Sequence, residues 1–148
     1  MTRDIRAPRA RIFDALSDFE TIENRLRGRG ALVERVDDGG AGPSGAAWRL
    51  EFDLLEKRRA LEAHVIRIAP DDALAIAARS SGLDLTLDAV LSDTSGEATR
   101  MTLDATILAA TLKGKVLLQS MKLARSRITR AIENRIDDLV VRAEQGRL

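Results

Sequence analysis

The 148-residue sequence contains no cysteine, no tyrosine and only one histidine. The lack of cysteine excludes disulfides, thiol catalysis and zinc–thiolate sites, and a single histidine excludes a metal site built from several histidines. One Trp and three Phe are the only aromatic residues, which is too few for a platform that stacks single-stranded nucleic acid. Lys and Arg number 24 against 23 Asp and Glu. This near balance argues against a nucleic-acid partner.

Long hydrophobic runs are also missing. No stretch approaches the roughly 18 apolar residues of a membrane span, and the N-terminus has neither the apolar run nor the cleavage site of a secretory signal. We therefore expect a cytoplasmic protein. The length predicts one domain, residues 1–148, that can bury a sizeable core.

Helical periodicity is found near both ends of the chain. A short strand is expected at residues 2–6, followed by two short helices at residues 8–17 and 18–30. Asp18 is a suitable N-cap for the second helix, which is expected to point Ile22 and Leu26 inward. Residues 111–145 carry an apolar stripe at three- and four-residue steps, which predicts one long C-terminal helix.

The central region alternates apolar and polar residues with the period of two that is typical of strands with one wet face. Strands are predicted at residues 32–36, 48–54, 61–68, 74–80, 83–92 and 99–108. A Gly-rich loop, residues 37–47, follows the first of these. A sheet with one apolar face needs a cover, and only the C-terminal helix is long enough to provide it. The order of elements therefore predicts an α+β fold.

Several segments resemble the START/SRPBCC superfamily, which includes polyketide cyclase/dehydrase and birch-pollen-allergen-like proteins. Ile5-Arg6-Ala7-Pro8, followed by IFDALSDF at residues 12–19, is similar to the opening of that superfamily. The Gly-rich loop before Trp48 fits its turn between the second and third strands. Ala69-Pro70 before the fifth strand and Thr99-Arg100 at the start of the seventh also match. The resemblance covers nearly the whole chain. It implies a helix-grip fold, in which a curved seven-stranded antiparallel sheet surrounds the long C-terminal helix, with two short helices after strand 1.

The first strand is shorter here than is usual in the superfamily, since only residues 1–6 precede Ala7-Pro8. A short edge strand leaves backbone groups of its neighbour unpaired. Homodimerisation is therefore a hypothesis.

The resemblance also implies an apolar cavity between the sheet and the C-terminal helix, which binds lipids, polyketides, hormones or quinones and in some members serves catalysis. Small inward residues such as Ala89 and Ala105 favour such a space, although Leu and Met could instead fill it as a packed core. The expected cavity residues lie on the apolar faces of these elements: Trp48, Leu50, Phe52, Leu54, Ile76, Leu85, Leu87, Met101, Leu103, Met121 and Ile128.

Trp48 and His64 each allow two interpretations. Trp48 could stack on a ligand, or it could pack in the core with its N–H bonded to the backbone. His64 is a weak candidate for proton transfer, because histidine titrates near neutral pH. However, the pattern of its strand leaves open which face is inside, and a lone histidine without a local carboxylate is usually structural or on the surface. We predict no further catalytic residue, no metal and no cofactor.

Charged residues are expected on the outer surface. Arg79 and Arg100 share the polar parity of their strands with Asp84, Asp88 and Asp104, which we expect to be their cross-strand partners. From Thr111 on, nine Lys or Arg stand against four acidic residues. A basic helix of this kind could contact an anionic membrane transiently, or it could simply present a solvated face.

The leading functional prediction is non-catalytic carriage or sensing of a hydrophobic small molecule of the lipid, quinone or polyketide class. The alternatives are a cyclase or dehydratase that uses the same cavity, and a protein-interaction module. A carrier needs an apolar cavity with few polar anchors, whereas an enzyme needs at least two convergent titratable groups. An interaction module needs an exposed apolar patch.

Overall fold

The computed structural model describes residues 1–36, 45–54, 56–94 and 97–145. Its strands form one antiparallel sheet in the order β1-β7-β6-β5-β4-β3-β2. The strands are β1 (Thr2–Ile5), β2 (Leu32–Arg35), β3 (Ala47–Leu54), β4 (Lys57–Ala69), β5 (Ala73–Ser80), β6 (Leu83–Asp93) and β7 (Thr99–Ala109). The helices are α1 (Arg9–Leu16), α2 (Phe19–Gly28), α3 (Leu112–Leu123) and α4 (Arg125–Gln145).

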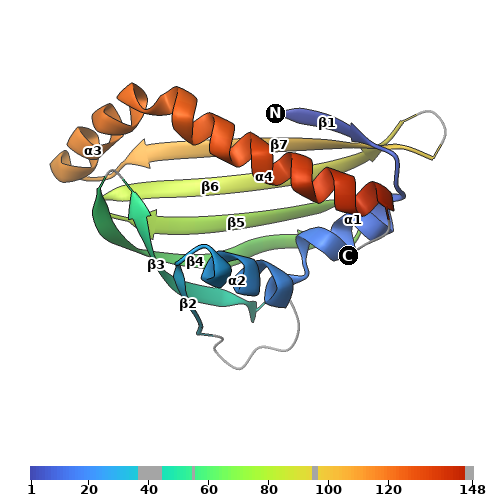
Figure 1. The fold of residues 1–148 in the computed structure, drawn as a ribbon, viewed down its shortest axis with the longest axis horizontal. Coiled ribbons are helices and arrows are strands. Elements are labelled where there is room, and N and C mark those ends of the chain that lie inside the picture. Colours follow the sequence, from blue (N-terminus) through green and yellow to red (C-terminus); the bar gives the residue numbers. More distant parts are fainter. Residues whose placement is uncertain (37–44, 55, 95–96, 146–148) are drawn as a thin grey trace.

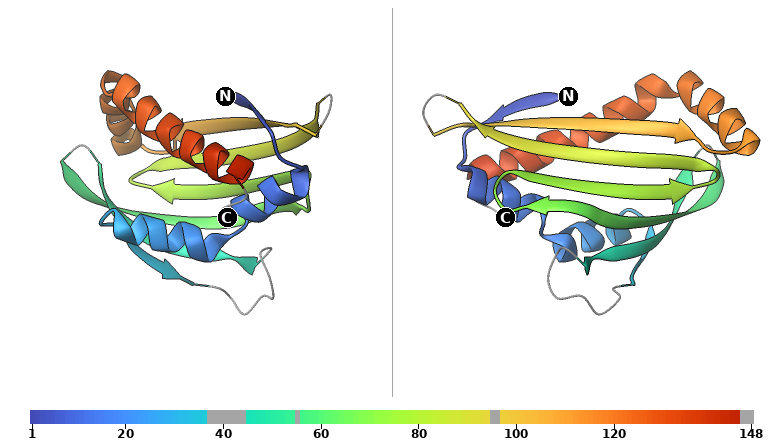
Figure 2. Two further views of the ribbon diagram at one scale, coloured as in Figure 1. Left: turned by 45° about the vertical axis from the view of Figure 1, so that its right-hand side comes forward. Right: turned by 180° about the vertical axis from the view of Figure 1, so that it is seen from behind.

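All four helices lie on the concave side of the curved sheet or at its end (Figure 1). α4 crosses the concave face, and the sheet alone is seen in front when the molecule is viewed from behind (Figure 2). The predicted α+β helix-grip fold, with a short first strand and two short helices after it, is confirmed.

The alternation in β6 correctly indicated the two faces of the sheet. Leu83, Ala89 and Leu91 are buried on the helix side. On the other face Arg79 lies opposite Asp84, and the Arg79 Nε donates to the Asp84 Oδ1 at 3.0 Å, as expected. The other expected cross-strand pairs, between Arg100 and the aspartates Asp88 and Asp104, are not formed.

Arg100 binds Asp4 of β1 rather than an aspartate of β6 or β7, with its Nε 2.9 Å from the Asp4 Oδ1. Asp88 and Asp104 are opposite one another across β6 and β7. The outer face of the sheet therefore places two carboxylates side by side.

The hydrophobic core is concentrated where β1, α1 and the end of α4 meet the sheet. Ile5, Ile12 and Met101 are completely buried there, and Ala143 brings the last turn of α4 into the same cluster. The hydroxyl of Thr99 donates to the backbone oxygen of Ala7 at 2.7 Å and satisfies a buried polar group. This packing fixes the C-terminal half of α4 over the sheet.

The helix predicted over residues 111–145 is divided in two at Ala124, whose φ of −101° and ψ of 12° end α3. The beginning of α3 is held against the β5–β6 turn, because a Cβ atom on Gly114 would lie only 2.1 Å from the Gly82 oxygen. Gly82 itself has a φ of 80°, which favours glycine. One end of the segment is thus fixed at this turn and the other over the core, and the helix changes direction between them (Figure 1).

At the edge of the sheet, β1 pairs with residues 99–102 of β7, and Met1 exchanges two backbone hydrogen bonds with Leu103. The rest of that edge of β7 has no strand beside it in the described residues, so homodimerisation stays a prediction. The predicted Gly-rich loop lies outside the described residues over 37–44. Among the described helices, none combines the length and hydropathy needed to cross a bilayer.

Candidate ligand-binding site

A cavity of about 380 Å³ lies between α2 and α4. Its apolar lining comes from α1, α2, β6 and α4: Ala15, Leu16, Ile22, Leu26, Leu87, Ile132, Ile136 and Leu139. This volume lies within the range of roughly 300–1,000 Å³ that is usual for small-molecule sites. The cavity can therefore accept the apolar part of a small molecule.

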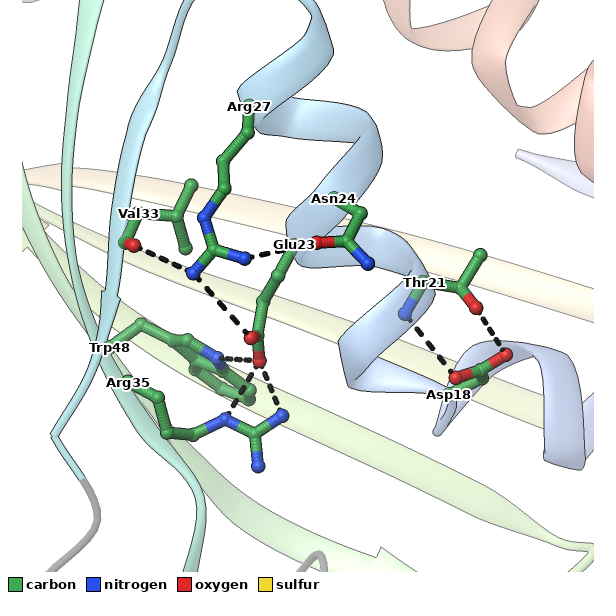
Figure 3. Close-up of polar contacts among 8 residues, drawn as sticks. All are labelled: Asp18, Thr21, Glu23, Asn24, Arg27, Val33, Arg35 and Trp48. Carbon is green, nitrogen blue, oxygen red and sulfur yellow. Dashed lines mark hydrogen bonds and ion pairs between the residues drawn. The ribbon is translucent and has the colours of Figure 1, made fainter.

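The two long walls are stripes of aliphatic side chains at helical spacing. Ile22 and Leu26 are four residues apart on α2, and Ile132 and Ile136 are four apart on α4, so each pair lies on one face of its helix. Both stripes line the same cavity. Asp18 is the N-cap of α2, and its Oδ1 accepts the backbone N–H of Thr21 at 3.3 Å (Figure 3). This cap is the one predicted from the sequence.

The charged residues that line the cavity are mainly arginines: Arg25, Arg29, Arg135 and Arg142, together with Asp18 and Asp138. Within the described chain, Arg25, Arg29 and Arg135 have no carboxylate at ion-pair distance. The Arg142 Nε donates to the backbone oxygen of Asp138 at 3.2 Å. Positive charge at the site is thus left without a fixed counter-ion.

Glu23 determines where α2 sits relative to the sheet. Its side chain is buried, and its Oε2 accepts from the Trp48 Nε1 at 3.0 Å and from the Arg35 Nε at 2.7 Å (Figure 3). The Arg27 guanidinium approaches the other carboxylate oxygen and donates to the backbone oxygen of Val33 at 2.9 Å. These contacts join α2 to β2 and β3. They therefore fix one wall of the cavity.

Trp48 packs in this cluster and does not line the α2–α4 cavity. Its ring meets Phe19 edge-on, with the ring centroids 4.8 Å apart and an angle of 76° between the planes. The Arg35 guanidinium lies 5.6 Å from the centroid of Trp48. The partner of the indole N–H is a carboxylate rather than the backbone acceptor considered in the sequence analysis.

Of the eleven expected cavity residues, Leu87 lines the α2–α4 cavity. Trp48, Met101 and Leu103 are buried in the core. The other expected residues are partly buried and are not part of this lining: Leu50, Phe52, Leu54, Ile76, Leu85, Met121 and Ile128. The lining residues of α2 and α4 were not among the expected cavity residues. Helical periodicity had identified them only as inward residues.

His64 lies on the opposite side of the sheet from the cavity. It is exposed, whereas its neighbours Ala63 and Val65 are buried on the helix side. No group of three potential metal ligands occurs in the described parts of the chain. Every buried polar side-chain atom described has a hydrogen-bond partner. The site can thus bind and orient a molecule. Its titratable groups are the four arginines and two aspartates of the cavity lining.

No family model matches the sequence, and no curated protein matches it. Solved structures do match. The Zhui aromatase/cyclase from Streptomyces sp. R1128 is 13% identical with a TM-score of 0.70, over 98% of this chain and 92% of that one. The protein TTHA0849 from Thermus thermophilus is 18% identical with a TM-score of 0.68, over 99% of this chain and 96% of that one.

Ara h 8.0201 is a third similar structure, 16% identical with a TM-score of 0.58, over 93% of this chain and 95% of that one. At these identities the likeness is one of fold. The chain shares the helix-grip fold of these structures, which confirms the fold that the resemblance implied.

Proposed function

We propose that this protein binds and carries a hydrophobic small molecule of the lipid, quinone or polyketide class in the α2–α4 cavity. The observation that carries this proposal is the aliphatic lining of a cavity of about 380 Å³. Burial of apolar ligand surface there contributes roughly 25 cal/mol per Å² to binding, before the entropic cost of association. Sharing a fold with an aromatase/cyclase supports the use of this architecture around a small molecule.

The charged residues of the lining favour a ligand with an anionic end. Arg25, Arg29 and Arg135 are not neutralised by carboxylates of the described chain. A guanidinium forms strong, charge-assisted hydrogen bonds with a carboxylate or phosphate. An amphiphile could therefore place its apolar part between the helices and its acidic end against these arginines.

Carriage without chemical conversion fits the arrangement of titratable groups. General acid–base catalysis needs groups within hydrogen-bond reach of the reacting atoms. The lining carboxylates are those of Asp18, which caps α2, and Asp138. His64 faces away. The alternative, a cyclase or dehydratase, is favoured by the fold likeness to the Zhui aromatase/cyclase, and the experiment below separates the two.

Native mass spectrometry of the protein as purified, without delipidation, tests the proposal. Hexadecanoic acid, hexadecanol, a short-chain quinone and 3-hydroxyhexadecanoic acid, which a dehydratase would convert with the loss of one water, are then added one at a time. We expect an adduct, and stronger binding of the acid than of the alcohol. Ile136→Trp should block uptake by filling the cavity, whereas Val90→Trp adds the same group to the outer face and should not.

Two results would contradict the proposal. A protein that carries no adduct and takes up none of the probes has a cavity that serves packing only. A probe that is released with an altered mass would instead establish an enzyme.

A further inference from the structure

Helix α3 is apolar on two opposite faces. Its inner face contains Gly114 and Leu117, which are buried against the rest of the protein. On its outer face Leu112, Val116 and Leu123 are 78%, 63% and 92% exposed. These three lie along one line of the helix, because they are spaced by four and seven residues. An aliphatic stripe this exposed is not required by the fold of the chain.

The segment around α3 is strongly basic. Residues 105–132 contain six Lys or Arg and no Asp or Glu. Lys113, Lys115 and Lys122 belong to α3 itself, and Arg125 follows it. Within the described chain these side chains have no acidic partner at ion-pair distance. The outer stripe is thus flanked by uncompensated positive charge.

α3 lies at the end of the sheet that is remote from α1 and from the C-terminal end of α4 (Figures 1 and 2). It is held in place by the contact between Gly114 and Gly82. The Thr111 hydroxyl also caps the helix by accepting the backbone N–H of Gly114 at 3.0 Å. The stripe is therefore presented by a helix that is already formed, which reduces the ordering cost of binding.

We propose that α3 docks on the surface of an anionic lipid bilayer. Leu112, Val116 and Leu123 would enter the boundary between headgroups and acyl chains, as the apolar face of an interfacial helix does. The lysines would extend along the surface toward lipid phosphates. This interaction goes beyond ligand carriage and does not depend on occupancy of the α2–α4 cavity.

The charge pattern favours a bilayer over a second copy of the chain. In a two-fold symmetric contact the same patch meets itself. The cations of α3 would then oppose those of the partner, without acidic residues to offset them. An anionic lipid surface offers negative charge around an apolar interior and matches both properties of the stripe.

Co-sedimentation with vesicles tests the proposal. Vesicles of phosphatidylcholine containing one quarter phosphatidylglycerol should bind the protein at low salt, and pure phosphatidylcholine vesicles should bind it far less. The double variant Leu112→Ser/Leu123→Ser should lower the partition coefficient by about tenfold or more. Ile66→Ser/Val90→Ser removes two exposed apolar side chains from other surfaces, and we expect it to bind like the unmodified protein. Circular dichroism verifies that each variant is folded.

The depth of contact can be measured with tryptophan. Val116→Trp should show a blue-shifted emission on anionic vesicles and quenching by brominated lipid, whereas Val90→Trp should show neither. The cavity-blocking Ile136→Trp variant should co-sediment normally, which separates docking from ligand carriage. Failure to bind anionic vesicles, or undiminished binding of the Leu112/Leu123 variant, would overturn the proposal. So would a concentration-dependent dimer mass that is abolished by that variant, since the stripe would then serve self-association.

Discussion

Removal of the Glu23 carboxylate should destabilise the protein by about 3 kcal/mol. In Glu23→Ala the Trp48 N–H, which is bonded at 3.0 Å in a buried position, loses its acceptor at a cost of about 1–3 kcal/mol. The Arg35 side chain is 34% exposed, so water partly replaces its lost bonds and we assign about 1 kcal/mol to that loss. Glu23→Gln keeps an oxygen acceptor and loses only the charge, so we expect about half the effect.

Urea unfolding followed by far-UV circular dichroism measures these differences, with the fluorescence of Trp48 as a second probe. Glu34→Ala is the matched control. Its carboxylate belongs to β2 and is 67% exposed, 3.9 Å from Arg49, and exposed pairs of this kind contribute at most about 1 kcal/mol. We therefore expect Glu34→Ala to change the free energy of unfolding by less than about 0.5 kcal/mol.

A double-mutant cycle with Trp48→Phe isolates the indole–carboxylate bond and should give a coupling energy of about 1 kcal/mol. Glu23→Ala within about 0.5 kcal/mol of the unmodified protein would refute the reasoning. An equal loss of unfolding free energy in Glu23→Ala and Glu23→Gln would also refute it. The oxygen acceptor that Gln retains would then contribute nothing to stability.

Three further substitutions test the packing of the sheet and of α3. Asp104→Lys should raise the free energy of unfolding by about 0.5–1 kcal/mol, because Asp104 lies directly opposite Asp88 and like charges in that position are unfavourable. Arg100→Gln should return the pKa of Asp4 toward 3.8 in an NMR titration, because the hydrogen bond from the Arg100 guanidinium lowers that pKa. The stabilisation by this pair is fully present above pH 3.8 and is lost as the pH falls through the lowered pKa of the folded state. Gly114→Ala should destabilise the protein by about 2 kcal/mol in thermal or urea unfolding, since the new methyl group would meet a backbone oxygen of the β5–β6 turn.

Each of these has a control variant or a result that would contradict it. Asp104→Asn removes charge without adding its opposite and should give part of the gain, so equal stability of all three forms would contradict the repulsion. An Asp4 pKa unaffected by Arg100→Gln would mean that another group lowers it. Gly28→Ala places a methyl group at the end of α2 with no atom within 4 Å. Gly114→Ala should be clearly less stable than Gly28→Ala.

The sheet was predictable because a period of two directly encodes which side chains share a face. Arg79 and Asp84 could be paired for this reason, since they lie opposite one another in adjacent strands. The partner of Arg100 could not, because Asp4 is 96 residues away and belongs to a strand of only four residues. The break at Ala124 was hidden as well. The residues around it contain no proline or glycine that would mark a break.

The sequence predicted that apolar residues would line the candidate site, but it did not predict where the cavity lies. Alternation identified Leu87 as an inward residue, and helical spacing did the same for Ile22 and Ile136. Neither pattern shows which part of the inward surface the helices leave uncovered. That depends on the distance between α2 and α4, and this distance is set in part by the contact between Glu23 and Trp48, which are 25 residues apart.

The walls of the cavity have a consequence for biosynthesis. One wall is formed by residues 15–29 and the other by residues 132–142, so the cavity is complete only when these two distant segments meet across the sheet. Contacts of such long sequence separation carry a large loop-closure cost, and a chain emerging from the ribosome acquires its N-terminal part first. A nascent chain therefore exposes the aliphatic face of α2 until almost all of α4 has been synthesised. A ligand can stabilise the finished fold, but it cannot act as a template for the early stages of folding.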